Sequence, residues 1–295
     1  MRIRYTLAAL VGLGVLTGCN RDVAGVDTVL QESATIRYVN AVPDTSLLDF
    51  RFVDGSIEGS PQYSGIGFRT FTPYQRIRPG ERRIRVFTNP NLYDNAAAVA
   101  VQRHVDTTFT FEPNTRYTII SFGNSRVGAT PRHRLVILRD ELPATLTATQ
   151  IGVRTIHAAA GAGNVDVYIR PSETPAAISG APAAANVPEL GATGYAALPA
   201  RPTGTAADTL SYRWDITAPG STTPIPLTVP TGRGLLGRVG TVAANPLAGF
   251  QVGRTAMTII IVPRSVAGSR APQTAAFTNA TAIFLPDAAL DRTEP

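Results

Sequence analysis

Short runs in which apolar and polar residues alternate recur along the chain. Residues 48–52 read Leu-Asp-Phe-Arg-Phe, and residues 83–86 read Arg-Ile-Arg-Val. Successive side chains of a β-strand point to opposite faces, so each run predicts a strand with one buried face. The turn-forming dipeptide Asp54-Gly55 follows the first run, and Pro79-Gly80 precedes the second. The pattern therefore predicts short strands joined by turns.

Further strands are predicted at residues 109–111, 117–122 and 135–138. Beyond residue 19, no segment shows the 3.6-residue periodicity of an amphipathic helix. The 23 prolines and 26 glycines are spread between the short runs, which favours an antiparallel β-sandwich over a helical bundle. We therefore expect an all-β fold.

The strand pattern occurs twice. Residues 36–55 align without gaps with residues 153–172, and Arg37 is matched by Arg154. The alternating apolar positions of the two segments coincide as well. Two later pairs of segments keep the same order: residues 117–120 with 257–260, and residues 136–140 with 283–287. An internal repeat of this kind predicts two copies of one structural unit.

The repeat predicts two tandem antiparallel β-sandwich domains, at residues 34–148 and 149–295. The second copy is longer than the first, and its extra residues fall between matching segments. Residues 175–208 lie in that extra length and are rich in alanine, proline, glycine and threonine. This composition predicts a long irregular loop, either an inert insertion or a binding loop.

The chain opens with a short apolar segment. Arg2 and Arg4 precede residues 5–16, an apolar run of only twelve residues. As a helix, twelve residues span roughly 18 Å, well short of the roughly 30 Å core of a bilayer. Residues 1–18 are therefore predicted to be a secretory signal peptide rather than a membrane-spanning helix.

The signal ends in Leu16-Thr17-Gly18-Cys19, and Cys19 is the only cysteine in the protein. This ending resembles the lipobox of bacterial lipoproteins, whose cysteine is acylated and becomes the mature N-terminus. The resemblance implies lipidation of Cys19, a lipid-anchored exported protein and a tether at residues 19–33. An ordinary cleaved signal is the alternative. Asn20 follows the cysteine, and the absence of aspartate there favours the outer over the inner membrane; the face of the membrane stays open.

All 27 basic residues are arginine, and the net charge is +6. Residues 20–148 hold 15 arginines against 13 acids, and residues 149–295 hold 10 against 8. Each half is therefore only slightly positive, and no sustained basic stripe is present. Together with export, this distribution excludes nucleic acid as an expected partner.

Two segments of the second copy carry a family resemblance. Residues 153–158 read Val-Arg-Thr-Ile-His-Ala, and residues 165–169 read Val-Asp-Val-Tyr-Ile. They resemble the opening of the bacterial domain of unknown function 4397. The first copy departs from this pattern, with Asn40 where His157 stands. The resemblance implies two copies with immunoglobulin-like sandwich folds, on exported and often lipid-anchored proteins, and it brings no established activity.

Residues that carry catalysis are sparse. The chain has no Gly-x-Ser-x-Gly motif, and its three histidines, His104, His133 and His157, do not have metal-ligand spacing. His157 is predicted to be a strand histidine with a local hydrogen bond. Asp49 and its repeat counterpart Asp166 are predicted to point outward from their strands, where an arginine pairs with them. We therefore expect no enzyme activity, no metal site and no cofactor.

The densest charge of the chain lies in residues 76–85. With Ile84 and Val86 facing inward, Arg83 and Arg85 are predicted to share one exposed strand face. Such a face either binds phosphates or acidic glycans, or is a solvated surface that protects a sheet edge. The candidate anion-contacting residues are Arg76, Arg78, Arg82, Arg83 and Arg85.

These observations favour a non-enzymatic, lipid-anchored protein of the cell envelope that acts as a structural or interaction module. The alternative is a module that binds envelope or extracellular polysaccharide, through the residue 76–85 face or the residue 175–208 loop. The expected partners are the membrane, through the lipid anchor, and an envelope glycan or another envelope protein.

Overall fold

The computed structural model describes residues 32–54, 62–89, 102–143, 145–171, 177–201, 212–225, 227–228 and 249–289. Residues Ser33–Pro295 belong to one compact unit. The predicted signal peptide, the lipobox with Cys19, and the tether up to residue 31 lie outside the described residues. So do Gly55 of the predicted turn and both ends of the predicted 175–208 loop.

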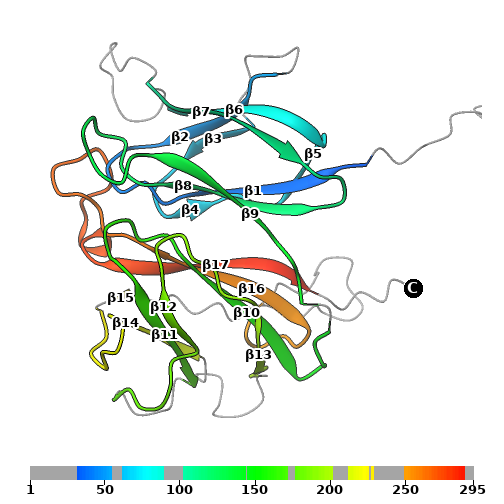
Figure 1. The fold of residues 1–295 in the computed structure, drawn as a ribbon, viewed down its shortest axis with the longest axis vertical. Helices are drawn as coiled ribbons and strands as arrows, with labels where there is room; N and C mark the ends of the chain where they lie inside the picture. The colour runs from blue at the N-terminus through cyan, green and yellow to red at the C-terminus, as the bar shows by residue number, and fades with distance from the viewer. Residues whose placement is uncertain are drawn as a thin grey trace, which may run out of the picture. The chain divides into compact units, whose positions relative to one another are not determined.

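The first half of the described chain forms two sheets (Figure 1). The inner sheet has the order β4-β1-β8-β9, and β5 also pairs with β1. The outer sheet has the order β3-β2-β6-β7. The strands are β1 (Ala34–Asn40), β2 (Leu48–Phe52), β3 (Tyr63–Ile66), β4 (Thr70–Phe71), β5 (Gln75–Ile77), β6 (Gly80–Thr88), β7 (Arg103–Phe111), β8 (Arg116–Phe122) and β9 (Arg134–Arg139).

The second half repeats this arrangement. Its inner sheet has the order β13-β10-β16-β17-β15, and its outer sheet the order β12-β11-β14. The strands are β10 (Gln150–His157), β11 (Val165–Pro171), β12 (Ala184–Val187), β13 (Ala196–Pro199), β14 (Tyr212–Thr217), β15 (Leu227–Thr228), β16 (Thr255–Val262) and β17 (Ala280–Ala289). The described residues contain no α-helix, only the 3₁₀ turn η2 (Ala275–Phe277), so the all-β prediction is confirmed.

The internal repeat is reproduced in the strand pairing. Strand β1 pairs with β8 with Arg37 opposite Thr118, and β10 pairs with β16 with Arg154 opposite Thr258. Both pairs are parallel, whereas purely antiparallel sandwiches were predicted. The first strand of each copy lies beside a strand that follows a long excursion through the outer sheet. Such a crossover permits parallel pairing, which a tight hairpin does not.

Each half has its own apolar core between its inner and outer sheets. In the first, Tyr38 packs on Phe50 with ring centroids 5.2 Å apart. In the second, the Trp214 ring lies 6.3 Å from Tyr212 and 5.0 Å from Phe284, all measured between centroids. Trp214 therefore packs beside Tyr212 in the second core. The two halves are tandem β-sandwiches of the predicted immunoglobulin-like class.

A third apolar core lies between the two inner sheets. Val39 and Ile120 of the first copy cluster with Ile156, Ile260 and Leu285 of the second. The inner sheets therefore pack against each other through the faces that point away from their own sandwich cores. All eight residues of β16 are buried as a consequence. This two-sided burial explains why four consecutive apolar residues, 259–262, end the strand without alternation.

The prediction of a long irregular loop at residues 175–208 is wrong for the described residues of that segment, which include two strands. Strand β12 pairs with β11, and β13 pairs with β10. Alanine and proline have low β-propensity, so these edge strands are not visible in the composition. Strands β12 and β13 form through hydrogen bonding to their neighbours β11 and β10 instead. None of the described residues lies in a helix long and apolar enough to span a bilayer.

Candidate functional site

Two arginine–aspartate pairs cross between the inner sheets. Arg37 Nη2 lies 2.6 Å from Asp287 Oδ1, and the two side chains are 1% and 0% exposed. Arg154 Nη2 lies 2.6 Å from Asp140 Oδ1, with side chains 6% and 0% exposed. The arginine of each copy therefore pairs with the aspartate of the other copy. The repeat aligned these residues but did not indicate that the pairs exchange partners.

Threonines on the neighbouring strands complete each pair. Thr118 Oγ1 donates a hydrogen bond to Asp140 Oδ2 at 2.7 Å and accepts one from Arg37 Nε at 2.8 Å. Thr258 stands in the matching place, 2.8 Å from Asp287 Oδ2 and 3.1 Å from Arg154 Nε. Each threonine links an aspartate of its own copy to the arginine of that copy, so the two ion pairs form one connected network.

Tyrosines cover the network on both sides. The Tyr74 hydroxyl donates to Asp140 at 2.8 Å, and the Tyr195 hydroxyl donates to Asp287 at 2.7 Å. The Arg37 guanidinium lies 4.6 Å from the centroid of the Tyr74 ring. Burial raises the pKa of both tyrosines, so they remain neutral donors. Asp140 accepts hydrogen bonds at both oxygens, whereas Asp287 Oδ1 has only its ion pair with Arg37. Every carboxylate oxygen thus has a partner within the protein, which fits a structural role better than a catalytic one.

The loop between β16 and β17 is fixed to the first copy by Arg69. Its guanidinium donates to the carbonyl of Pro263 at 2.7 Å, of Ala276 at 2.9 Å and of Asn279 at 2.5 Å. Burial lowers the pKa of Arg69 to about 10, so the side chain is still charged at neutral pH. The ring of Phe277 lies 5.9 Å from that of Phe68. The β16–β17 loop is part of the second copy and is held by contacts with the first copy.

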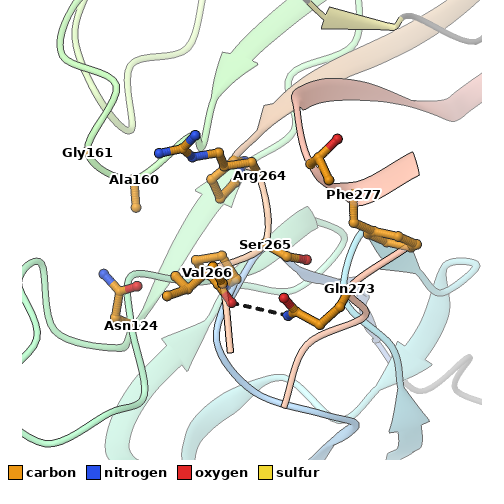
Figure 2. A pocket seen from close by; sticks show the side chains of 12 residues that line it. Asn124, Ala160, Gly161, Arg264, Ser265, Val266, Gln273 and Phe277 are labelled. Atoms are coloured by element: carbon orange, nitrogen blue, oxygen red, sulfur yellow. Dashed lines mark hydrogen bonds between the residues drawn. The ribbon is translucent and has the colours of Figure 1, made fainter. Parts of the chain in front are cut away.

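A pocket of about 490 Å³ opens beside this loop (Figure 2). Asn124 of the first copy and Gly161 of the second line it together with Arg264 and Phe277. The amide of Gln273 also faces it but donates to the Val266 carbonyl at 3.1 Å, the contact marked in Figure 2. Arg264 is the only charged side chain among the described residues that line this pocket. The other polar side chains of the lining, those of Asn124, Ser265, Gln273 and Thr278, are uncharged.

The arginine-rich strand has the geometry predicted for two of its members. Ile84 and Val86 are fully buried, and Arg83 and Arg85 share the opposite face of β6. Both bind Asp106 of β7: Arg83 Nε lies 2.9 Å from Oδ1, and Arg85 Nε lies 3.0 Å from Oδ2. Arg83 and Arg85 lower the pKa of Asp106 to about 2. Sequence reasoning missed this carboxylate, because only residues 109–111 of β7 were predicted to form a strand.

The other candidate arginines are not part of that face. Arg82 turns to the opposite side of β6, where its Nε lies 2.5 Å from Asp54 Oδ2 and its guanidinium covers the Phe52 ring. Arg76 on β5 and Arg78 after it are exposed. Arg103, which was not among the candidates, lies on the Arg83 face, with Nη1 3.1 Å from Asp106 Oδ2. Of the five candidate arginines, only Arg83 and Arg85 therefore share one face of β6.

Two histidines that are far apart in sequence lie together. The rings of His104 on β7 and His133 before β9 have centroids 5.4 Å apart. His133 is held by two hydroxyls, Ser125 Oγ at Nδ1 and Ser121 Oγ at Nε2, both at 3.0 Å. Burial lowers the pKa of His133 to about 3. A base this weak is a poor partner for activating Ser125 as a nucleophile.

The remaining titratable candidates have local structural contacts. His157 Nε2 lies 2.7 Å from the Gly163 carbonyl oxygen, so the predicted local hydrogen bond is confirmed. Asp49 and Asp166 lie on the strand faces opposite their core-facing neighbours, as predicted, but both are buried rather than exposed to solvent. Asp49 accepts from the Gly65 amide at 2.9 Å and Asp166 from the Asn186 amide at 2.6 Å. Both amides belong to edge strands, Gly65 to β3 and Asn186 to β12, whose pairing with the neighbouring strand is irregular, and these carboxylates supply the acceptors. Asp49 also pairs with Arg51 at 3.1 Å.

The described part of the chain holds no group of three or more His, Cys, Asp or Glu residues arranged to bind a metal ion. No curated protein matches the chain. Among protein families, Domain of unknown function (DUF4397) matches residues 34–168, a segment that runs from the start of β1 into β11. The match is single and covers the first copy together with the opening strands of the second. Residues 34–168 are therefore similar to the domain of unknown function 4397.

Proposed function

We propose that the protein is a non-enzymatic, lipid-anchored module of the cell envelope, in which two copies of the domain of unknown function 4397 act as one rigid spacer or interaction unit. The observation that supports it is the exchange of Arg37–Asp287 and Arg154–Asp140 pairs between the copies. Separating the copies would expose an apolar core and leave four charges without their partners. A rigid body of two sandwiches serves display or spacing, which needs no moving parts.

The lipid anchor is supported by the sequence. The Leu16-Thr17-Gly18-Cys19 segment places a single cysteine at the end of a short apolar run. Several acyl chains on one cysteine provide stable membrane attachment, because each buried methylene contributes about 0.8 kcal/mol. Asn20 favours the outer membrane as the location.

Protease shaving of intact cells, with Cys19→Ala as the matched control, tests this proposal. Wild-type protein is expected in the membrane fraction, and the variant is expected outside it. Digestion in intact cells assigns the module to the cell surface, whereas digestion only after outer-membrane permeabilisation assigns it to the periplasmic face. If wild type and variant fractionate identically as free protein, the lipid anchor is refuted.

A second candidate function is binding of an acidic envelope or extracellular polysaccharide to the Arg83 face. The observation that favours it is that three arginines, Arg83, Arg85 and Arg103, share the single carboxylate of Asp106. Guanidinium groups outnumber the acid and retain N–H donors for a second anion. Retention of the protein on an acidic glycan column should fall for Arg83→Ser with Arg85→Ser. Unchanged retention would refute this function.

A further inference from the structure

A second pocket, of about 430 Å³, lies at the end of the inner sheet of the first copy where the β16–β17 loop crosses over. Its lining combines four segments of the first copy with residues 268–270 of the second. Pockets that bind small molecules have volumes of roughly 300–1,000 Å³. The side chains that matter here are those of Asp44, Thr88, His104, Arg126 and Arg270.

The only acid among the described residues of this lining is not available to a ligand. The Asp44 side chain is 0% exposed, and its carboxylate accepts from the amides of Ser125 at 2.7 Å and Arg126 at 3.0 Å. It also accepts from Arg126 Nε at 3.3 Å. Asp44 therefore holds the 125–126 segment in place, and its charge is already compensated from within the protein.

The two arginines of the lining remain accessible. The Arg126 side chain is 54% exposed and uses only Nε for its contact with Asp44, which leaves both terminal nitrogens for a ligand. Arg270 is exposed, and it makes no ion pair or side-chain hydrogen bond within the described part of the chain. A pocket with two guanidinium groups and one compensated carboxylate attracts an anion, and guanidinium binds carboxylates through paired N–H donors.

The lining also holds side chains that are polar but uncharged. Thr88 Oγ1 and His104 Nε2 are 2.7 Å apart, on adjacent strands β6 and β7. Burial lowers the pKa of His104, so its ring is neutral at pH 7. Thr45 and Gln102 add a hydroxyl and an amide to the lining. Neutral donors and acceptors of this kind match hydroxyl groups, for which a bare inorganic anion has no counterpart.

We propose that this pocket binds an acidic sugar, with the carboxylate of a uronic acid residue at Arg126 and Arg270 and its hydroxyl groups at Thr88 and His104. The site is separate from the Arg83 face, and the inference does not rest on the proposed function. One or two sugar rings suit a pocket of this size.

Calorimetric and ligand-detected NMR titrations of the purified full chain with glucuronate, glucose and inorganic phosphate at pH 7 test this assignment. Glucuronate is expected to bind, and glucose and phosphate to bind at least tenfold more weakly. Arg270→Ser should reduce glucuronate affinity by about ten- to hundredfold, the range for one charge-assisted contact. Because Arg270 is exposed and makes no contact that the fold needs, the variant should keep its thermal stability.

Arg139→Ser is the matched control, since Arg139 is exposed and pairs in register with Tyr117 at the start of β8, while the pocket takes in residues 125–127 beyond the end of that strand. Its glucuronate affinity should equal that of the wild type. Absence of glucuronate binding, equal affinity for phosphate, or equal losses for Arg270→Ser and Arg139→Ser would each overturn the proposal.

Discussion

Arg37 of the first copy and Asp287 of the second lie 2.6 Å apart with almost no exposure to solvent. The same contact is made in reverse by Arg154 and Asp140. This reciprocity is the geometry of an isologous dimer interface, in which residue i meets residue j and j meets i. Here the two partners are joined in one chain, so the interface forms without dependence on protein concentration.

Removing one partner of a buried ion pair is expected to destabilise the protein more than replacing both partners with apolar residues. Arg37→Met removes one partner and leaves Asp287 buried with fewer donors, which should lower the free energy of unfolding by about 3–5 kcal/mol. The double variant Arg37→Met with Asp287→Leu should recover most of that loss, because no unpaired charge remains. Urea unfolding followed by Trp214 fluorescence measures both.

The matched control is Arg139→Met, which breaks a pair with Glu112 whose side chains are 53% and 59% exposed. Its effect should stay below about 1 kcal/mol. Equal losses for Arg37→Met and Arg139→Met would contradict the buried character of the first pair.

His133 should make stability depend on pH. Burial lowers the pKa of its ring to about 3 in the folded protein, from the ordinary histidine value of 6.5 that applies to the unfolded chain. The unfolded chain then binds a proton that the folded chain does not, so unfolding becomes easier as the pH falls below 6.5. Between pH 7 and pH 5 this amounts to about 2 kcal/mol. His133→Gln, which cannot titrate, should show a flatter dependence in urea unfolding at the two pH values.

His104 and His157 are present in both proteins, and burial lowers their pKa in the same direction. The difference between the two slopes therefore isolates His133. Identical slopes for wild type and His133→Gln would show that the ring is not held neutral by burial.

The repeat and strands β2, β6, β7, β8 and β9 were predictable because alternating or apolar runs mark them, whereas short strands such as β3, β4, β12 and β13 leave no such run. The inner-sheet strand β16 was harder to predict, because both of its faces are buried and its sequence does not alternate between apolar and polar residues. The exchange of Arg37 and Arg154 between copies could not be predicted. An alignment shows equivalent positions but does not distinguish contacts within a copy from contacts between copies.

The candidate sites were predicted less well than the fold. Contact between His104 and His133 depends on how β7 and the loop before β9 meet across two sheets, which sequence spacing does not encode. The pocket at Arg270 joins loops of both copies, and each loop alone reads as ordinary turn sequence. Positions along a strand follow from local periodicity, whereas a pocket between loops follows from tertiary packing.

Asp106 controls how much positive charge the β6–β7 face presents. Asp106→Asn keeps the size of the side chain but removes the charge shared by Arg83, Arg85 and Arg103. The variant should elute from a heparin column at higher salt than the wild type, and Arg83→Ser should elute at lower salt. Because the face is largely solvated, thermal stability should change little. An unchanged elution of both variants would show that the face does not contact polyanions.

Gly253 should tolerate no side chain. A Cβ atom at this position would lie 1.8 Å from the carbonyl oxygen of Ala148, in the segment that leads into β10. Since a backbone atom is in the way, β16 and that segment would have to separate. Gly253→Ala should therefore lower the free energy of unfolding by more than about 2 kcal/mol.

Gly194→Ala is the matched control, because no atom lies within 4 Å of the Cβ that would be added there. Alanine also restricts the unfolded chain more than glycine does, so this variant should be neutral or slightly stabilised. Thermal unfolding of both variants beside the wild type tests the contrast. If Gly253→Ala unfolds at the wild-type temperature, the close approach of the Ala148 carbonyl to β16 is wrong, and with it the packing of the linking segment against the second inner sheet.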